Sequence, residues 1–158
     1  LLSHQDLLAV DADLLPGPHH GVAAAHGVHL VHGLVQHPRP LLVHLLTGVR
    51  AVGVEIEPAY CRVARACAEE LGLTGVSFVQ ADAREADYAQ GTVFYLFTPF
   101  VGEMLQAVLD RLEAQTRGRE VTVCSYGPCS PHVARQAWLR SDDPEPEHEF
   151  KLALFENI

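Results

Sequence analysis

Short apolar runs alternate with amphipathic stretches along most of this chain, which is the pattern of strands and helices that follow one another. The runs that are rich in β-branched and aromatic residues predict strands at 51–56 (AVGVEI), 76–80 (VSFVQ), 92–97 (TVFYLF), 120–125 (EVTVCS) and 150–156 (FKLALFE). Residues 27–35 are a further candidate strand, with less regular surroundings.

Helical periodicity fills the gaps between these runs. Residues 41–46 read as the end of an apolar helix that Thr47 and Gly48 stop. A second helix begins at Pro58, with Glu57 as its N-cap, and ends at Gly72. Its apolar face is formed by Val63, Cys67 and Leu71, and a third helix, closed near Gly118, has the face Leu105, Val108, Leu109 and Leu112.

Alternating strands and helices predict an α/β fold, in which crossover helices connect the strands of a parallel sheet. In such sheets, ligands bind at the carboxyl ends of the strands, near the point where the strand order reverses. The residues that directly follow each predicted strand are therefore the candidate site residues.

Composition agrees with one globular domain, since 48% of the residues are hydrophobic and 20% are charged. The formal net charge of −9 argues against a general nucleic-acid-binding surface. No apolar run is long enough to span a membrane. The chain has no basic leader and no starting Met, which suggests a fragment or a trimmed chain. Four cysteines without a CxxC pair favour a reducing compartment, so we expect a cytoplasmic protein.

The first 40 residues differ in composition from the rest. Eight of the ten histidines lie at or before His44, together with four prolines and a single arginine, Arg39. Residues 1–40 are therefore separated as an irregular segment from a domain at 41–158. The segment is a variable extension, a stretch translated out of frame, or a metal-binding segment built on His26, His29 and His32. No acid or cysteine accompanies these histidines at ligand spacing, so we expect no metal site.

Two acids follow neighbouring predicted strands. Glu55 closes residues 51–56, where a carboxylate can accept two hydrogen bonds from a ribose diol. Asp82 follows residues 76–80, where it can accept from an exocyclic adenine amine while the N–H of Ala83 donates to a ring nitrogen. The structural alternatives are a solvated acid at the strand end for Glu55 and an Asx turn for Asp82.

Two further segments follow strands. Thr98, Pro99 and Phe100 come after residues 92–97, where they form either the wall of a pocket or an ordinary strand-to-helix turn. Cys124 and Cys129 flank the end of residues 120–125, and we interpret them as buried thiols rather than as a metal or redox pair.

Taken in order, GVEIEPAY, QADAR and VFYLFTPF resemble successive motifs of class I S-adenosylmethionine-dependent methyltransferases, from about residue 41 to the end of the chain. They are similar in particular to the seven-strand, non-SET histone-lysine methyltransferase branch. The resemblance implies a three-layer Rossmann-like sheet that is mostly parallel. It also implies an antiparallel C-terminal hairpin formed by residues 137–139 and 150–156, with the acidic residues 142–147 in its loop.

The same resemblance implies roles for single residues. Glu55 would hold the ribose of S-adenosylmethionine, with Ile56 beside it, and Asp82 and Ala83 would recognise the adenine. Thr98, Pro99 and Phe100 would border the methyl group and its acceptor, which is a protein or a small molecule. No residue is implied as a catalytic acid or base, and a strong base is not needed if the acceptor arrives neutral.

One family motif is missing. The first strand of this superfamily leads into an acid and a Gly-x-Gly loop, but residues 33–40 (GLVQHPRP) contain one glycine, no acid and two prolines. The N-terminal strand and loop are thus predicted to be incomplete or irregular. A catalytically inactive or truncated methyltransferase-derived fold is therefore an alternative. A nicotinamide-dependent oxidoreductase is another, but it would need a GxGxxG motif about 20 residues before Glu55, and the sequence has none.

Overall fold

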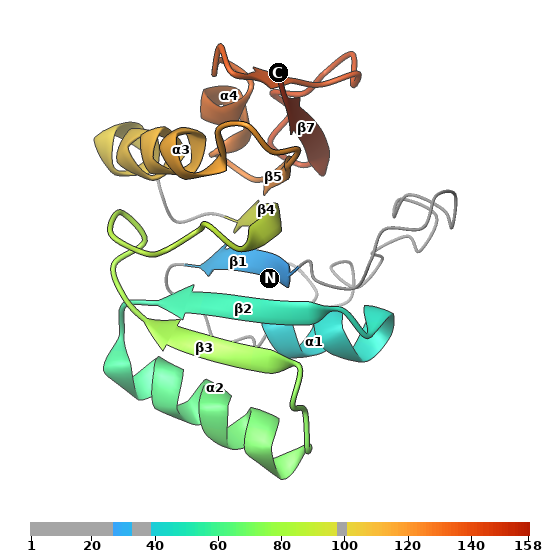
Figure 1. The fold of residues 1–158 in the computed structure, drawn as a ribbon. Coiled ribbons are helices and arrows are strands. Elements are labelled where there is room, and N and C mark those ends of the chain that lie inside the picture. The colour runs from blue at the N-terminus through green and yellow to red at the C-terminus, as the bar shows by residue number, and fades with distance from the viewer. Residues whose placement is uncertain (1–26, 33–38, 98–100) are drawn as a thin grey trace, which may run out of the picture.

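A computed structural model of the protein describes residues 27–32, 39–97 and 101–158, and for 27–32 it describes the backbone alone. Within these ranges one sheet has the strand order β3-β2-β1-β4-β5-β7-β6 (Figure 1). Its strands are β1 (Gly27–His32), β2 (Arg50–Glu55), β3 (Val76–Gln80), β4 (Gly91–Phe97), β5 (Thr122–Tyr126), β6 (Leu139–Arg140) and β7 (Ala153–Asn157). The helices are α1 (Arg39–Thr47), α2 (Pro58–Glu70), α3 (Gly102–Thr116) and α4 (Ser130–Val133).

The first five strands are parallel, and β7 runs antiparallel to both β5 and β6. The predicted α/β class, with a mostly parallel sheet and an antiparallel C-terminal strand, is therefore confirmed. β1 lies at the centre, between β2 and β4, although it comes before the boundary that composition suggests at residue 41. The register between β1 and β4 shifts between Gly27 and Val28.

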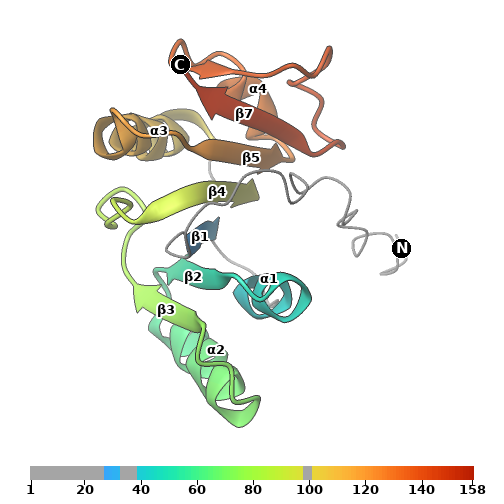
Figure 2. The same cartoon turned by 45° about the vertical axis from the view of Figure 1, so that its right-hand side comes forward.

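Helices cover the two faces of the sheet, and Figure 2 shows α1 and α3 on opposite sides of it. A small core packs α1 and α2 against β3, through Leu41, Cys61, Ala68 and Phe78. A larger core packs α3 against β4, β5 and β7, with Phe94, Leu96, Leu109, Val123 and Phe155 among its buried side chains. None of the helices in the described ranges is long and apolar enough to cross a bilayer.

The predicted helix ends are confirmed by their backbone geometry. Gly48 and Gly72 have φ values of 71° and 64°, which a residue without Cβ adopts at little cost. At the start of α2, the side chain of Glu57 accepts a hydrogen bond from the N–H of Ala59, and Pro58 occupies the first helical turn. Local sequence signals therefore set these helix ends.

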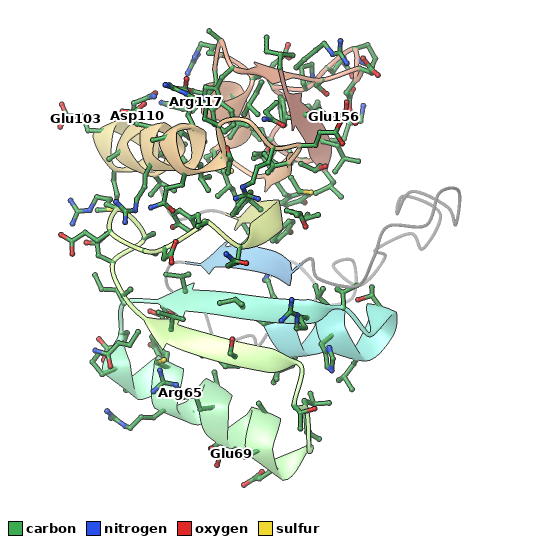
Figure 3. The ribbon with its side chains drawn as sticks, viewed as in Figure 1. Arg65, Glu69, Glu103, Asp110, Arg117 and Glu156 are labelled. Atoms are coloured by element: carbon green, nitrogen blue, oxygen red, sulfur yellow. The ribbon has the colours of Figure 1, made fainter. Side chains whose placement is uncertain are left out.

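The edge strand β3 is capped from the side by α2. Both Nε and Nη2 of Arg65 donate to the carbonyl oxygen of Phe78, at 3.0 and 2.7 Å (Figure 3). An edge strand presents unpaired backbone groups that invite pairing with another chain. Arg65 thus satisfies one of the exposed carbonyls of this edge.

Several predicted boundaries differ from the structure, most of them by one or two residues. Strand β7 begins at Ala153 rather than at 150, because the chain turns at 150 and bends at 151, and the Phe150 side chain is 81% exposed. Its hairpin partner is Leu139–Arg140. Helix α1, of which the sequence predicted only the end, begins at Arg39 and has Pro40 in its first turn. Proline fits there because the first helical N–H groups have no partner within the helix.

Candidate functional site

The carboxylate of Glu55 lies at the carboxyl end of β2 and is largely withdrawn from solvent, with 8% of the residue exposed. Its Oε1 accepts a hydrogen bond from the N–H of Glu57 at 2.7 Å, which fixes the side chain at the start of α2. No hydrogen bond to Oε2 is found within the part of the chain that the structure describes. One oxygen of a held carboxylate is thus available to a ligand.

The second candidate acid lies on the neighbouring strand end. The carbonyl oxygen of Glu55 accepts from the N–H of Ala81 at 3.1 Å, and Asp82 is the next residue. Since β2 and β3 are parallel neighbours, Glu55 and Asp82 lie at the same edge of the sheet. Ile56 directly follows Glu55, and its side chain is 57% exposed.

Asp82 is already engaged by a cation of this chain. Its Oδ1 accepts from the N–H and the Nε of Arg84 at 2.8 and 3.0 Å, and its Oδ2 accepts from Nη2 at 2.5 Å. The bond to the backbone N–H makes this the Asx turn that the sequence left open as an alternative. The Arg84 guanidinium lowers the pKa of the Asp82 carboxyl to about 2, so this carboxyl is ionised at neutral pH.

The loop that carries these residues is held by α3. Ala83 is buried, and its carbonyl oxygen accepts from the hydroxyl of Tyr88 at 2.7 Å. The Gln115 side chain accepts from the N–H of Tyr88 at 2.6 Å, and Arg111 donates to the carbonyl oxygens of Glu85 and Ala86. Backbone groups that a loop would otherwise leave to water are thus satisfied by one helix, which fixes the position of Asp82 and Ala83.

Other predicted site residues lie elsewhere or beyond the described ranges. Thr98, Pro99 and Phe100 fall outside the residues that the structure describes, as does the loop in place of the Gly-x-Gly motif at 33–38. His26 also lies outside them, and within them no group of three metal-binding side chains is found. Cys124 and Cys129 are buried free thiols, and burial raises the pKa of the Cys124 thiol to about 12.

The sequence alone did not reveal a row of aromatic rings at the carboxyl ends of β4 and β5. Phe97 stacks between Tyr95 and Tyr126, with ring centroids 6.3 and 5.6 Å apart and ring planes 11° and 16° from parallel. Arg39, at the start of α1, lies over Phe97 with its guanidinium carbon 3.6 Å from the ring centroid. Its Nη1 donates to the hydroxyl of Tyr95 at 3.4 Å. The spacing of Tyr95 and Phe97, two residues apart on one strand face, was the available signal.

The fold is similar to that of several solved structures, methyltransferases among them. An RNA methyltransferase from Salinibacter ruber, solved with S-adenosyl-L-homocysteine, is 24% identical over 83% of this chain and 78% of its own, with a TM-score of 0.56. TrmN from Thermus thermophilus is 14% identical over 85% of this chain, with a TM-score of 0.61. A mutant of MtNAS, solved with S-adenosylmethionine, is 17% identical over 85%, with a TM-score of 0.58.

These similarities show the fold, a Rossmann-like α/β fold that the chain shares with these solved structures. The chain spans 44% of TrmN and 55% of the MtNAS mutant, so about half of each of those proteins has no counterpart here. No protein-family model and no curated protein sequence matches the chain.

Proposed function

We propose that this protein binds S-adenosylmethionine at the carboxyl edge of its sheet and transfers the methyl group to a protein lysine or a small molecule. The observation that carries the proposal is the strand order, with its antiparallel β7, combined with a held carboxylate at the end of β2. The S-adenosyl ligands of the similar structures support it.

The residues at this edge fit the cofactor in part. Glu55 fits a ribose, because one carboxylate oxygen is held by backbone and the other is available. Ile56, exposed next to it, offers an apolar surface. The buried loop residue Ala83 is positioned rigidly, as recognition of an adenine ring requires. Asp82 fits an adenine amine only if Arg84 gives up one of its hydrogen bonds.

When bound, S-adenosylmethionine supplies a methyl group on a sulfonium. A lone pair of the acceptor forms the new bond to the methyl carbon, the carbon–sulfur bond breaks with its electron pair on sulfur, and the acceptor loses a proton. Such a displacement depends mainly on positioning and desolvation. Residues 98–100 are proposed to border the acceptor, since in the sequence they directly follow β4, whose carboxyl end lies at this edge.

A finer proposal concerns acceptor and location. Motif similarity supports the non-SET histone-lysine branch, and a net charge of −9 is compatible with a lysine-rich partner but unfavourable for nucleic acid. Free thiols, with no disulfide among the described residues, support a cytoplasmic protein.

Prolines in place of the glycine loop favour a second candidate, a methyltransferase-derived fold without activity. Pro38 lacks an N–H group in the segment that normally approaches the cofactor, and Pro40 lacks one in the first turn of the helix that follows it. If this segment is out of frame, another reading frame of the gene encodes an apolar strand, an acid and a Gly-x-Gly loop that ends near Pro40. Micromolar cofactor binding by the present chain would contradict this candidate.

Transfer of tritium from methyl-tritiated S-adenosylmethionine tests the proposed activity. Lysine-rich histone peptides, the same peptides with acetylated lysines, and a panel of small amines serve as acceptors. Label that appears in unmodified but not in acetylated peptide supports a protein lysine as acceptor, and label in an amine supports a small molecule. Absence of labelling together with absence of S-adenosylhomocysteine binding would contradict the proposal.

A further inference from the structure

Arg39 carries a positive charge for which the described part of the chain offers no negative partner. None of the ion pairs found there includes Arg39, and its Nε is buried without a hydrogen-bond acceptor. A guanidinium has five donors, and leaving a buried one unmatched costs free energy. The contacts of Arg39 with Tyr95 and Phe97 therefore leave much of its binding capacity unused.

Four other arginines of the chain make more hydrogen bonds than Arg39. Arg65 donates two hydrogen bonds to one carbonyl oxygen, and Arg111 donates to two carbonyl oxygens. Arg84 donates to both oxygens of the Asp82 carboxylate. Arg119 also has an unmatched Nε, but both of its terminal nitrogens donate to carbonyl oxygens. Arg39 differs from these four in having a single long hydrogen bond beside a buried, unmatched Nε, and its ring contact does not require a specific acceptor.

The position of Arg39 is the one where this class of sheet binds ligands. Phe97 and Tyr126 are the last residues of β4 and β5, and Arg39 begins the helix that follows β1. The strand order reverses between β1 and β4, and the crevice at such a point is the usual ligand site. Glu55 ends β2, whereas the rings under Arg39 belong to β4 and β5 on the other side of β1, so Arg39 and the acid proposed to bind ribose lie at the ends of different strands.

We propose that Arg39 and the hydroxyl of Tyr95 bind a carboxylate whose flat, apolar body lies along the row of rings formed by Tyr95, Phe97 and Tyr126. Arginine matches the two oxygens of a carboxylate in a planar fork, and stacked rings favour a flat body. Burial raises the pKa of the Tyr95 hydroxyl, which therefore remains protonated and can donate. The inference rests on the proposed methyl transfer for its source, an acidic methyl acceptor with a flat, apolar body.

Calorimetry with two matched pairs of ligands tests this site. The first pair is 2-naphthoate and 2-naphthamide, which differ in charge, and each is titrated with and without saturating S-adenosylhomocysteine. The second pair is S-adenosylhomocysteine and its decarboxylated analogue. The variants are Arg39→Gln and Tyr95→Phe, and the control is Arg62→Gln, which changes an exposed arginine on α2. Tyr95→Phe keeps the aromatic ring and so tests the site even if Arg39→Gln fails to fold.

We expect 2-naphthoate to bind about tenfold tighter than 2-naphthamide, or more, as hydrogen bonds to a charged group allow. Arg39→Gln should remove this advantage, Tyr95→Phe should reduce it, and Arg62→Gln should preserve it. Loss of the naphthoate advantage in Arg39→Gln assigns the site to an acidic acceptor, whereas a loss confined to the S-adenosylhomocysteine pair would place the cofactor there and overturn the inference. The proposed site would be overturned if the carboxylate binds no tighter than the amide, or if its tighter binding is unchanged in Arg39→Gln and Tyr95→Phe. Failure of the proposed function is distinct, because the naphthyl pair reports on Arg39 without S-adenosylhomocysteine.

Discussion

At the level of single residues, two acids on adjacent strand ends have unlike surroundings. Glu55 is buried and receives one hydrogen bond from backbone, whereas Asp82 receives a fork from Arg84 at the protein surface. Glu55 has one carboxylate oxygen without a hydrogen bond from the described residues. A ligand of Asp82 would instead have to replace a hydrogen bond from Arg84. The two acids should therefore respond differently to a ligand.

The pair formed by Asp82 and Arg84 makes a prediction for pH dependence. Because the folded-state pKa of Asp82 lies at about 2, below its usual value of about 3.9, the stabilisation from this pair is complete above pH ~4 and is lost as pH falls toward 2. Carbon-13 NMR titration of the Asp82 carboxyl should give a midpoint of about 2, and the midpoint should rise in Arg84→Ala. An unchanged midpoint in that variant would show that Arg84 is not the cause.

At the level of helices and strands, β2 packs closely against β3 and α1 at Gly53. A Cβ added to Gly53 would come within 2.7 Å of the ring of Phe78 and 3.0 Å of the ring of Pro40. Phe78 belongs to the small core under α1 and α2, so it has little space to move. The glycine in the strand therefore allows α1 and β3 to pack closely at β2.

Gly53→Ala should destabilise the protein by about 1–3 kcal/mol, the usual cost of an overpacked core. Urea unfolding monitored by circular dichroism should show a lower midpoint with an unchanged slope. The double variant Gly53→Ala/Phe78→Leu, compared with Phe78→Leu alone, should show a smaller loss because the clashing ring is gone. If Gly53→Ala unfolds at the wild-type midpoint, the close packing at β2 is not as described.

Local patterns predicted most elements, since apolar runs and helix-ending glycines act over a few residues. Gly48, Gly72 and Pro58 fixed helix ends correctly, and the parallel class followed from alternation. The position of β1 between β2 and β4 could not be predicted, because strand order depends on contacts between distant segments. For the same reason, the sequence did not reveal that Arg39 lies over Phe97. The contact between Arg84 and Asp82 is local, and the sequence had left the Asx turn at Asp82 open as an alternative.

In the molecule as a whole, the carboxyl edge of one sheet collects the features that the proposed function needs. Glu55 is the last residue of β2, and Asp82 lies in the loop after β3, which side chains of α3 hold by hydrogen bonds. The row of aromatic rings lies at the carboxyl ends of β4 and β5. The likeness to methyltransferases lies in the fold that builds this edge, while the missing glycine loop predicts that cofactor binding is weaker than micromolar.

Titration calorimetry of S-adenosylhomocysteine against the protein and its Glu55→Ala variant is the decisive measurement for a cofactor site at this edge. Glu57→Gln is the matched control, because it removes a neighbouring acid and keeps an oxygen for the helix cap. We expect weak but measurable binding to the unmodified chain. We also expect a loss of about 1.5–3 kcal/mol in Glu55→Ala, the scale of hydrogen bonds to a charged group, and little change in Glu57→Gln. Equal affinities for the unmodified chain and Glu55→Ala would contradict the cofactor site and leave Glu55 as a structural acid.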